Sequence, residues 1–78
     1  MKLYYASFAD ETKFLGGLFL EASDDIDAVW KAIKSPQNPG GEIAVLPVPD
    51  RVSVEDKHRN RLLSKEELDN PDIVHISE

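Results

Sequence analysis

The chain begins with two apolar runs separated by a short polar stretch. Residues 2–8 (KLYYASF) are rich in aromatic side chains and contain no glycine or proline, which is typical of a β-strand. Strand side chains alternate between two faces, so the pattern predicts one face with Leu3 and Tyr5 and an opposite face with Tyr4, Ala6 and Phe8. Residues 14–22 (FLGGLFLEA) return after the polar stretch. Together the two runs predict an antiparallel hairpin.

Two glycines interrupt the second of these strands. Glycine weakens a strand unless it forms a bulge or allows another group to approach the backbone closely. We therefore expect Gly16 and Gly17 to form a bulge or to pack beneath the single tryptophan, Trp30.

The next segment predicts the main helix. Ser23 or Asp24 can cap its first turn, and carboxylates at Asp24, Asp25 and Asp27 would meet the positive end of the helix dipole. Lys31 and Lys34 lie near the opposite end, and Pro36 stops the helix because proline cannot continue it. The large apolar residues fall at i, i+3, i+4 and i+7, on one face that we expect to form core: Ile26, Val29, Trp30 and Ile33.

The segment after the helix combines turn residues with the most apolar run of the chain. Asn38-Pro39-Gly40-Gly41 offers proline and glycine at the two central positions of a type II turn. Residues 42–48 (EIAVLPV) are apolar on both faces, which predicts a strand in the centre of the sheet until Pro47 interrupts its ladder.

The C-terminal part has weaker patterns. Residues 49–62 have few apolar positions and no period, and we interpret them as a loosely ordered surface segment. Ser64 and Glu67 have the spacing of a capping box, which predicts a short helix. Residues 73–77 (IVHIS) predict a last strand at an edge of the sheet. The chain is thus expected to form a single α+β domain, with one main helix on one face of a small antiparallel sheet.

A sheet this small is expected to expose the face that the helix does not cover. One helix of three to four turns cannot cover four of the aromatic side chains of the first two strands together, namely Tyr4, Phe8, Phe14 and Phe19. Some of them are expected to be exposed or to be covered by a partner, and a homodimer is one way to cover them.

Composition limits the classes of protein to consider. The 78 residues are 41% apolar and 31% charged, which is typical of one globular domain. The absence of cysteine excludes disulfides and thiolate chemistry and agrees with a reducing compartment. The N-terminus lacks the apolar region of a signal peptide, and no apolar run has the length of a membrane span. We expect a soluble, cytoplasmic protein.

Residues with catalytic or ligand-binding chemistry do not form a known arrangement. His58 and His75 have no partner at metal-ligand spacing, and the aspartates of residues 24–27 lack the glycine and glutamate of a calcium loop. Gly40 and Gly41 precede a strand and Glu42, whereas phosphate loops lead into a helix N-terminus. No nucleophile elbow occurs. We expect no enzyme activity, cofactor, metal or small-molecule substrate.

Residues 14–48 resemble a group of short uncharacterised bacterial and phage proteins. Members of this group combine an FLGG-like strand and a helix with an NPGGE turn before an apolar strand, and Asn38 to Glu42 is the most specific part of the resemblance. The resemblance covers about half of the chain. It implies a compact single domain of bacterial or phage origin, with no known activity and no catalytic residues to transfer.

The net charge of −6 is unevenly distributed and leads to three functional hypotheses. Residues 51–61 carry four basic and two acidic residues, a net charge of +2, whereas the other 67 residues carry 5 basic and 13 acidic residues, a net charge of −8. The preferred hypothesis is a protein-interaction module whose candidate contact residues are Asp24, Asp25, Asp27, Asn38 and Glu42. The alternatives are a nucleic-acid-associated regulator using Arg51, Lys57, Arg59 and Arg61, which the acidic body disfavours, and an acidic mimic of nucleic acid that inhibits a host defence protein.

Overall fold

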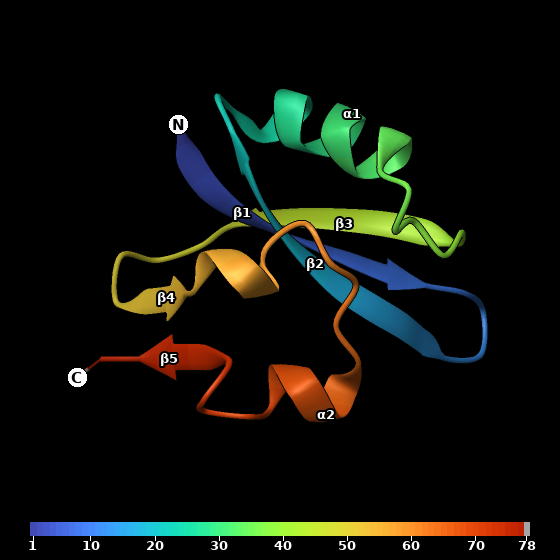
Figure 1. The fold of residues 1–78 in the computed structure, drawn as a ribbon. Coiled ribbons are helices and arrows are strands. Elements are labelled where there is room, and N and C mark those ends of the chain that lie inside the picture. Colours follow the sequence, from blue (N-terminus) through green and yellow to red (C-terminus); the bar gives the residue numbers. More distant parts are fainter. Residues whose placement is uncertain (78) are drawn as a thin grey trace.

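The computed structural model describes residues 1–77 and has the predicted α+β architecture (Figure 1). The elements in chain order are β1 (Lys2–Ala9), β2 (Phe14–Ala22), α1 (Asp25–Lys34), β3 (Glu42–Pro47), β4 (Val52–Val54), the 3-10 helix η1 (Asp56–His58), α2 (Lys65–Leu68) and β5 (Val74–Ile76). The first four elements confirm the predicted order of two strands, a helix and a third strand.

The predicted hairpin of β1 and β2 is confirmed. The two strands pair antiparallel, and the register shifts between Phe8 and Ala9, so β2 carries an irregularity next to Gly16. This agrees with the expected bulge. The alternative packing beneath Trp30 is wrong for Gly17, because a Cβ atom there would lie 2.5 Å from the hydroxyl oxygen of Tyr5.

The three-stranded sheet has the order β2-β1-β3, so β1 is the central strand. The prediction that β3 is central is therefore wrong: β3 pairs only with β1 and lies at an edge. The ladder also continues to Pro47, which pairs with Tyr4. Apolar residues on both sides of a strand thus do not require two neighbouring strands, because Ala44 and Leu46 of β3 face solvent.

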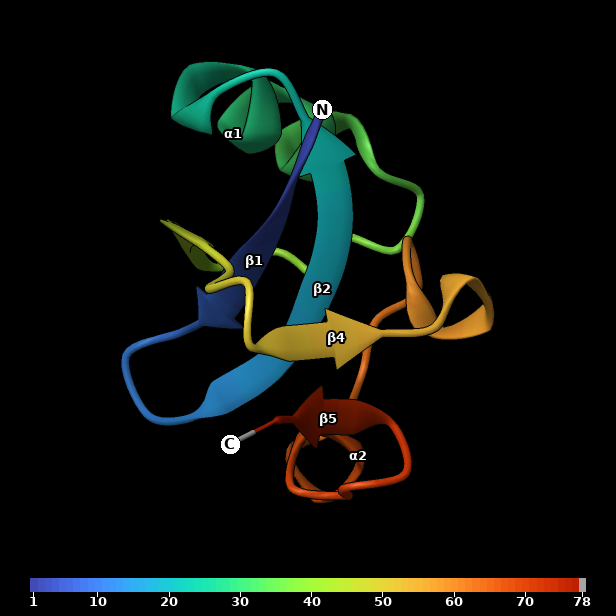
Figure 2. The same ribbon diagram turned by 90° about the vertical axis from the view of Figure 1, so that its left-hand side faces the viewer.

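The second face of the sheet is covered over β1 and β2, which corrects the expectation of an open face, whereas Leu46 of β3, the partner of Tyr5, is 61% exposed on that face. Of the four aromatic residues expected to exceed the cover of the helix, Phe14 is exposed, and Tyr4, Phe8 and Phe19 are buried. Alternation along β1 and β2 divides the core into two clusters. The cluster beneath α1 contains Tyr4, Ala6, Phe8, Leu18, Leu20, Ala22, Ala28 and Ala32. The cluster on the opposite side contains Phe19, Val54 and Leu63, with Leu3 and Tyr5 packed against it. Figure 2 shows that β4, β5 and α2 lie at the opposite side of the molecule from α1.

Residues 49–62 are more regular than the loosely ordered segment that their sequence predicts. β4 lies within this segment and pairs antiparallel with β5 in a separate two-stranded sheet, so the last strand does not extend the main sheet. The backbone of Leu63 exchanges hydrogen bonds with Gly17 of β2, at 2.7 and 3.0 Å. The capping box at α2 is confirmed, because the Ser64 and Glu67 side chains each accept a hydrogen bond from the backbone of the other residue.

The ends of α1 follow the predicted signals. The side chain of Asp24 accepts a hydrogen bond from the backbone N–H of Asp27, which makes Asp24 the N-cap. At the other end Ser35 is extended, as the residue before Pro36 must be. Gly40 has the positive φ, 90°, that the predicted turn requires. The backbone hydrogen bond that closes a turn lies earlier, however, from the N–H of Asn38 to the carbonyl of Ser35.

Candidate functional site

The large apolar side chains of α1 point away from the sheet. Ile26, Trp30 and Ile33 are 66%, 57% and 46% exposed, and we call these three residues the outer face of α1. Val29 is half-buried at its margin. The prediction that this stripe forms core is therefore wrong, although its residues do lie on one face of the helix as the spacing predicts.

The inner face of α1 consists of Ala28 and Ala32, both of which are fully buried. These residues are one helical turn apart, and Trp30 lies about 200° around the helix from Ala28. The reason is volume: Tyr4, Phe8 and other large side chains of the sheet already fill the space beneath the helix. Small residues let α1 lie close to them, so the larger side chains of the helix are left outside.

The three candidate aspartates lie together at the N-terminal end of α1, where their contacts stabilise the helix end. Asp24 is the N-cap, and the Asp27 carboxylate accepts a hydrogen bond from the backbone N–H of Ser23 at 2.9 Å. That hydrogen bond, with a smaller contribution from Lys31, holds the pKa of Asp27 below its usual value. Within residues 1–77, Asp25 accepts a hydrogen bond only from its neighbour Ile26, at 3.0 Å. Asp24 and Asp27 therefore have structural roles that account for them.

The other two candidate contact residues lie at the opposite end of the helix. The Asn38 side chain donates to the carbonyl of Ile33 at 3.1 Å and accepts from the N–H of Gly40 at 2.8 Å. Asn38 thus closes the C-terminal end of α1 and shapes the following turn. Glu42 is exposed at the start of β3. The five predicted contact residues do not form one surface, and the outer face of α1 lies between the two groups.

The edge of β3 that faces away from β1 is a second open feature, which the sequence prediction of a central strand missed. The outer edge of β2 is covered, because Gly17 and Phe19 form backbone hydrogen bonds with residues 60–63. Within residues 1–77, no hydrogen bond outside the β1–β3 ladder involves the backbone of Ile43 or Val45. Pro47 was the signal for this edge, since proline within a sheet favours edge strands.

Three of the four candidate nucleic-acid-binding residues pair with acidic or imidazole groups of the same chain. Arg59 contacts Glu21 at 2.9 Å and Asp56 at 3.3 Å and donates from Nε to the carbonyl of Val54. Arg61 and Lys57 pair with nearby residues in the same way.

Arg61 contacts Glu67 at 2.9 Å and His58 Nδ1 at 3.0 Å, and Lys57 contacts Glu55 at 3.4 Å. Arg51 is exposed just before β4. Because these cations neutralise carboxylates of the chain itself, fewer of them are available for phosphates, and the structure gives the nucleic-acid alternative no specific support.

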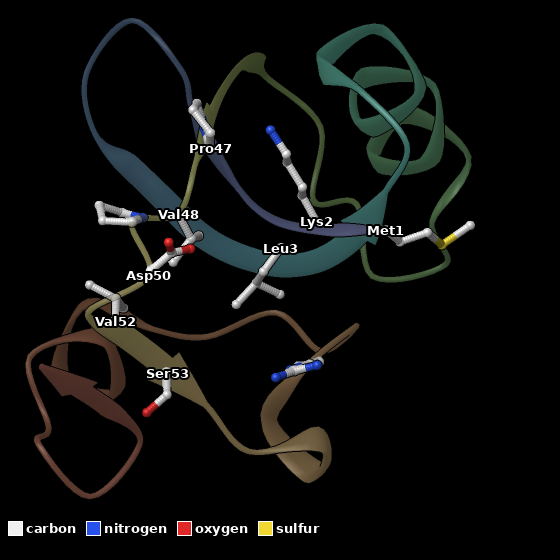
Figure 3. A pocket seen from close by; sticks show the side chains of 10 residues that line it. Met1, Lys2, Leu3, Pro47, Val48, Asp50, Val52 and Ser53 are labelled. Atoms are coloured by element: carbon white, nitrogen blue, oxygen red, sulfur yellow. The ribbon is translucent and has the colours of Figure 1, made fainter. Parts of the chain in front are cut away.

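A shallow hollow of about 510 Å³ lies between the start of β1 and residues 47–53 (Figure 3). Leu3 lies near the middle of the hollow, with Lys2 on one side of it and Val52 and Ser53 of β4 on the other. Lys2, Asp50 and Arg59 contribute charges of both signs to its lining. Arg59 is already bound to Glu21, so the hollow has no defined charge that would select a ligand.

Residues 1–77 contain no group of three or more histidine, aspartate or glutamate side chains that could hold a metal ion. Within the same residues, every helix is too short or too polar to cross a membrane. Comparison of the chain with protein families, with curated proteins and with solved structures finds no match. The resemblance to short bacterial and phage proteins therefore stays a prediction, and the geometry of the chain itself is the basis for a functional proposal.

Proposed function

We propose that this chain is a small acidic protein-interaction module that binds through the outer face of α1 and has no catalytic role. The observation that supports the proposal is the orientation of this helix. Ile26, Trp30 and Ile33 face away from a core that α1 contacts with only two alanines. A contiguous stripe of large apolar side chains on an otherwise charged surface marks a contact site, because its burial by a partner removes apolar area from water.

The composition of the stripe agrees with this role. Tryptophan is enriched among the residues that dominate the energy of protein interfaces. The Lys34 ammonium lies 5.8 Å from the centre of the Trp30 ring, which favours one arrangement of the exposed indole. Asp24 and Asp25 lie at one end of the stripe and Lys34 at the other, so the apolar centre has a charged rim.

Site-specific photo-crosslinking in the source cell tests this proposal. We would place the photoreactive residue p-benzoylphenylalanine at Trp30 and, as a matched control, at Phe14, an aromatic residue that is 38% exposed on β2. We expect protein adducts from position 30 that do not form from position 14. Equal adducts from both positions, or none from position 30, would contradict the proposed surface.

A further inference from the structure

The outward backbone groups of β3 follow from its pairing with β1. The N–H of Val48 donates to the carbonyl of Leu3 at 3.0 Å, so the backbone of Val48 points toward β1. Hydrogen-bonded and non-hydrogen-bonded pairs alternate along an antiparallel ladder. The backbone groups of Ile43, Val45 and Pro47 therefore point away from β1. Pro47 has no N–H, so Ile43 and Val45 supply the donors of this open edge.

The apolar side of α1 is turned toward the same open edge. Lys31 donates from Nζ to the carbonyl of Glu21 at 3.1 Å, which places the Lys31 side of the helix over β2. Val29 lies on the opposite flank of the helix, about 160° around the axis from Lys31, and Ile33 lies beside Val29. Since β2 and β3 are the two outer strands of the sheet, this flank faces the β3 side. Figure 1 shows α1 running alongside β3.

We propose that the partner of this surface is a second copy of the chain, an inference that rests on the proposed function and gives it a specific partner. Two β3 edges would pair antiparallel around a twofold axis and join the two sheets into one sheet of six strands. The two α1 helices would then lie on the same face of this sheet, with Ile33 and its apolar neighbours between them. A twofold axis requires a surface that is complementary to itself. The surface formed by the β3 edge and the apolar side of α1 meets this requirement through hydrogen bonds and through charge.

The first is hydrogen bonding. When Ile43 of one copy pairs with Val45 of the other, both residues of each copy use their outward N–H and carbonyl groups. Pro47 then lies beyond the new ladder, where its missing N–H costs nothing.

The second is charge. The twofold axis makes the two α1 helices antiparallel, so the acidic first turn with Asp24 and Asp25 of one copy lies on the side of Lys34 of the other. The opposite charges at the two ends of α1 are therefore complementary between copies, which fixes the relative direction of the helices.

Sedimentation equilibrium of the purified full chain over a wide concentration range tests this inference. We expect a monomer–dimer equilibrium. Val45→Pro removes an outward N–H, and Ile33→Glu places a carboxylate between the helices, so each is expected to weaken dimerisation about tenfold or more. Ile76→Glu is the matched control, since Ile76 is an exposed isoleucine on β5, and it is expected to leave the dimer unchanged.

Circular dichroism and thermal melting show whether each variant is folded, and Ile33→Glu tests the interface if Val45→Pro unfolds the chain. A wild-type chain that stays monomeric at all concentrations, or a dimer that both folded variants leave intact, would overturn the inference. Crosslinks from position 30 to a different protein, together with a monomeric chain, would overturn the self-association and leave the proposed function standing.

Discussion

The two faces of α1 differ in a way that the helix itself does not explain. The inner face has only Ala28 and Ala32, yet both are fully buried, whereas Ile26 and Trp30 on the outer face are more than half exposed. A stripe of large apolar residues usually identifies the side of a helix that packs on the core. Here the small residues pack on the core, because the sheet supplies the large side chains.

The two faces of α1 therefore separate packing on the core from contact with a partner. The inner face determines whether the domain folds, because replacements there change the packing of the core. The outer face is largely exposed and is the surface that we propose for association. Replacements on the two faces are therefore expected to have opposite profiles. Two replacements, one on each face, test this directly, and two more test the contacts at the N-terminal end of α1.

Ala32→Leu is expected to have the largest effect on stability. The new side chain would meet Tyr4, Phe8 and the other side chains that fill the space beneath α1. Overpacking of this kind typically costs about 1–3 kcal/mol, which lowers the melting midpoint of a domain this small by about 4–8 °C for each kcal/mol. Thermal unfolding measures the change. The neighbouring control Ile33→Leu, on the outer face, is expected to melt like the wild type.

Asp24→Ala is expected to destabilise the chain by about 1 kcal/mol, the typical value of a helix N-cap. The carboxylate of Asp24 accepts from the N–H of Asp27, which would lose its partner. Asp25→Ala removes a carboxylate from the same turn without removing the cap, and it is expected to change the stability by less than about 0.5 kcal/mol. Equal losses in urea unfolding of the two variants would contradict the structural role assigned to Asp24.

Trp30→Ser is expected to change the free energy of unfolding by less than about 0.5 kcal/mol, in contrast to Ala32→Leu, because Trp30 does not contribute to the core. The same replacement is expected to weaken self-association in the sedimentation assay. A large loss of stability in the monomeric state would show that the outer face belongs to the folding core after all.

Local signals explain which parts of the fold could be predicted from the sequence. The hairpin follows from alternation in residues 2–8, the ends of α1 follow from Asp24 and Pro36, and α2 follows from the Ser64–Glu67 spacing. Each of these depends on residues that are close in the chain. Their physical causes, which are strand alternation, capping and the conformational limits of proline, act over a few residues.

The errors concern contacts between distant segments. The packed side of α1 depends on the volume that β1 and β2 occupy. The position of β3 depends on its pairing with β1 across 41 positions, from Tyr5 to Leu46. The covered second face depends on Val54, in the segment without a period, and on Leu63, directly after that segment. The sequence pattern missed the candidate site for the same reason. It predicts that Trp30 lies in the core and that β3 is a central strand, whereas Trp30 is exposed and β3 has an open edge.

The smallest expected effect is a change in stability at low pH, and it depends on Asp27 at the N-terminal end of α1. The N–H of Ser23 and, less strongly, Lys31 hold the pKa of Asp27 below its usual value. A carboxyl group whose pKa is lower in the folded state stabilises that state at pH values above its unfolded pKa, about 3.9. This contribution is lost as the pH falls through the lower pKa of the folded chain.

The wild type is therefore expected to lose more stability between pH 5 and pH 2 than Asp27→Asn, which cannot lose a charge at this position. Thermal melting at a series of pH values measures the difference. Asp25→Asn, in the same helical turn, leaves the bond between Ser23 and Asp27 intact and is expected to keep the acid sensitivity of the wild type. If Asp27→Asn shows the same loss as the wild type, the charge of Asp27 does not stabilise the end of α1.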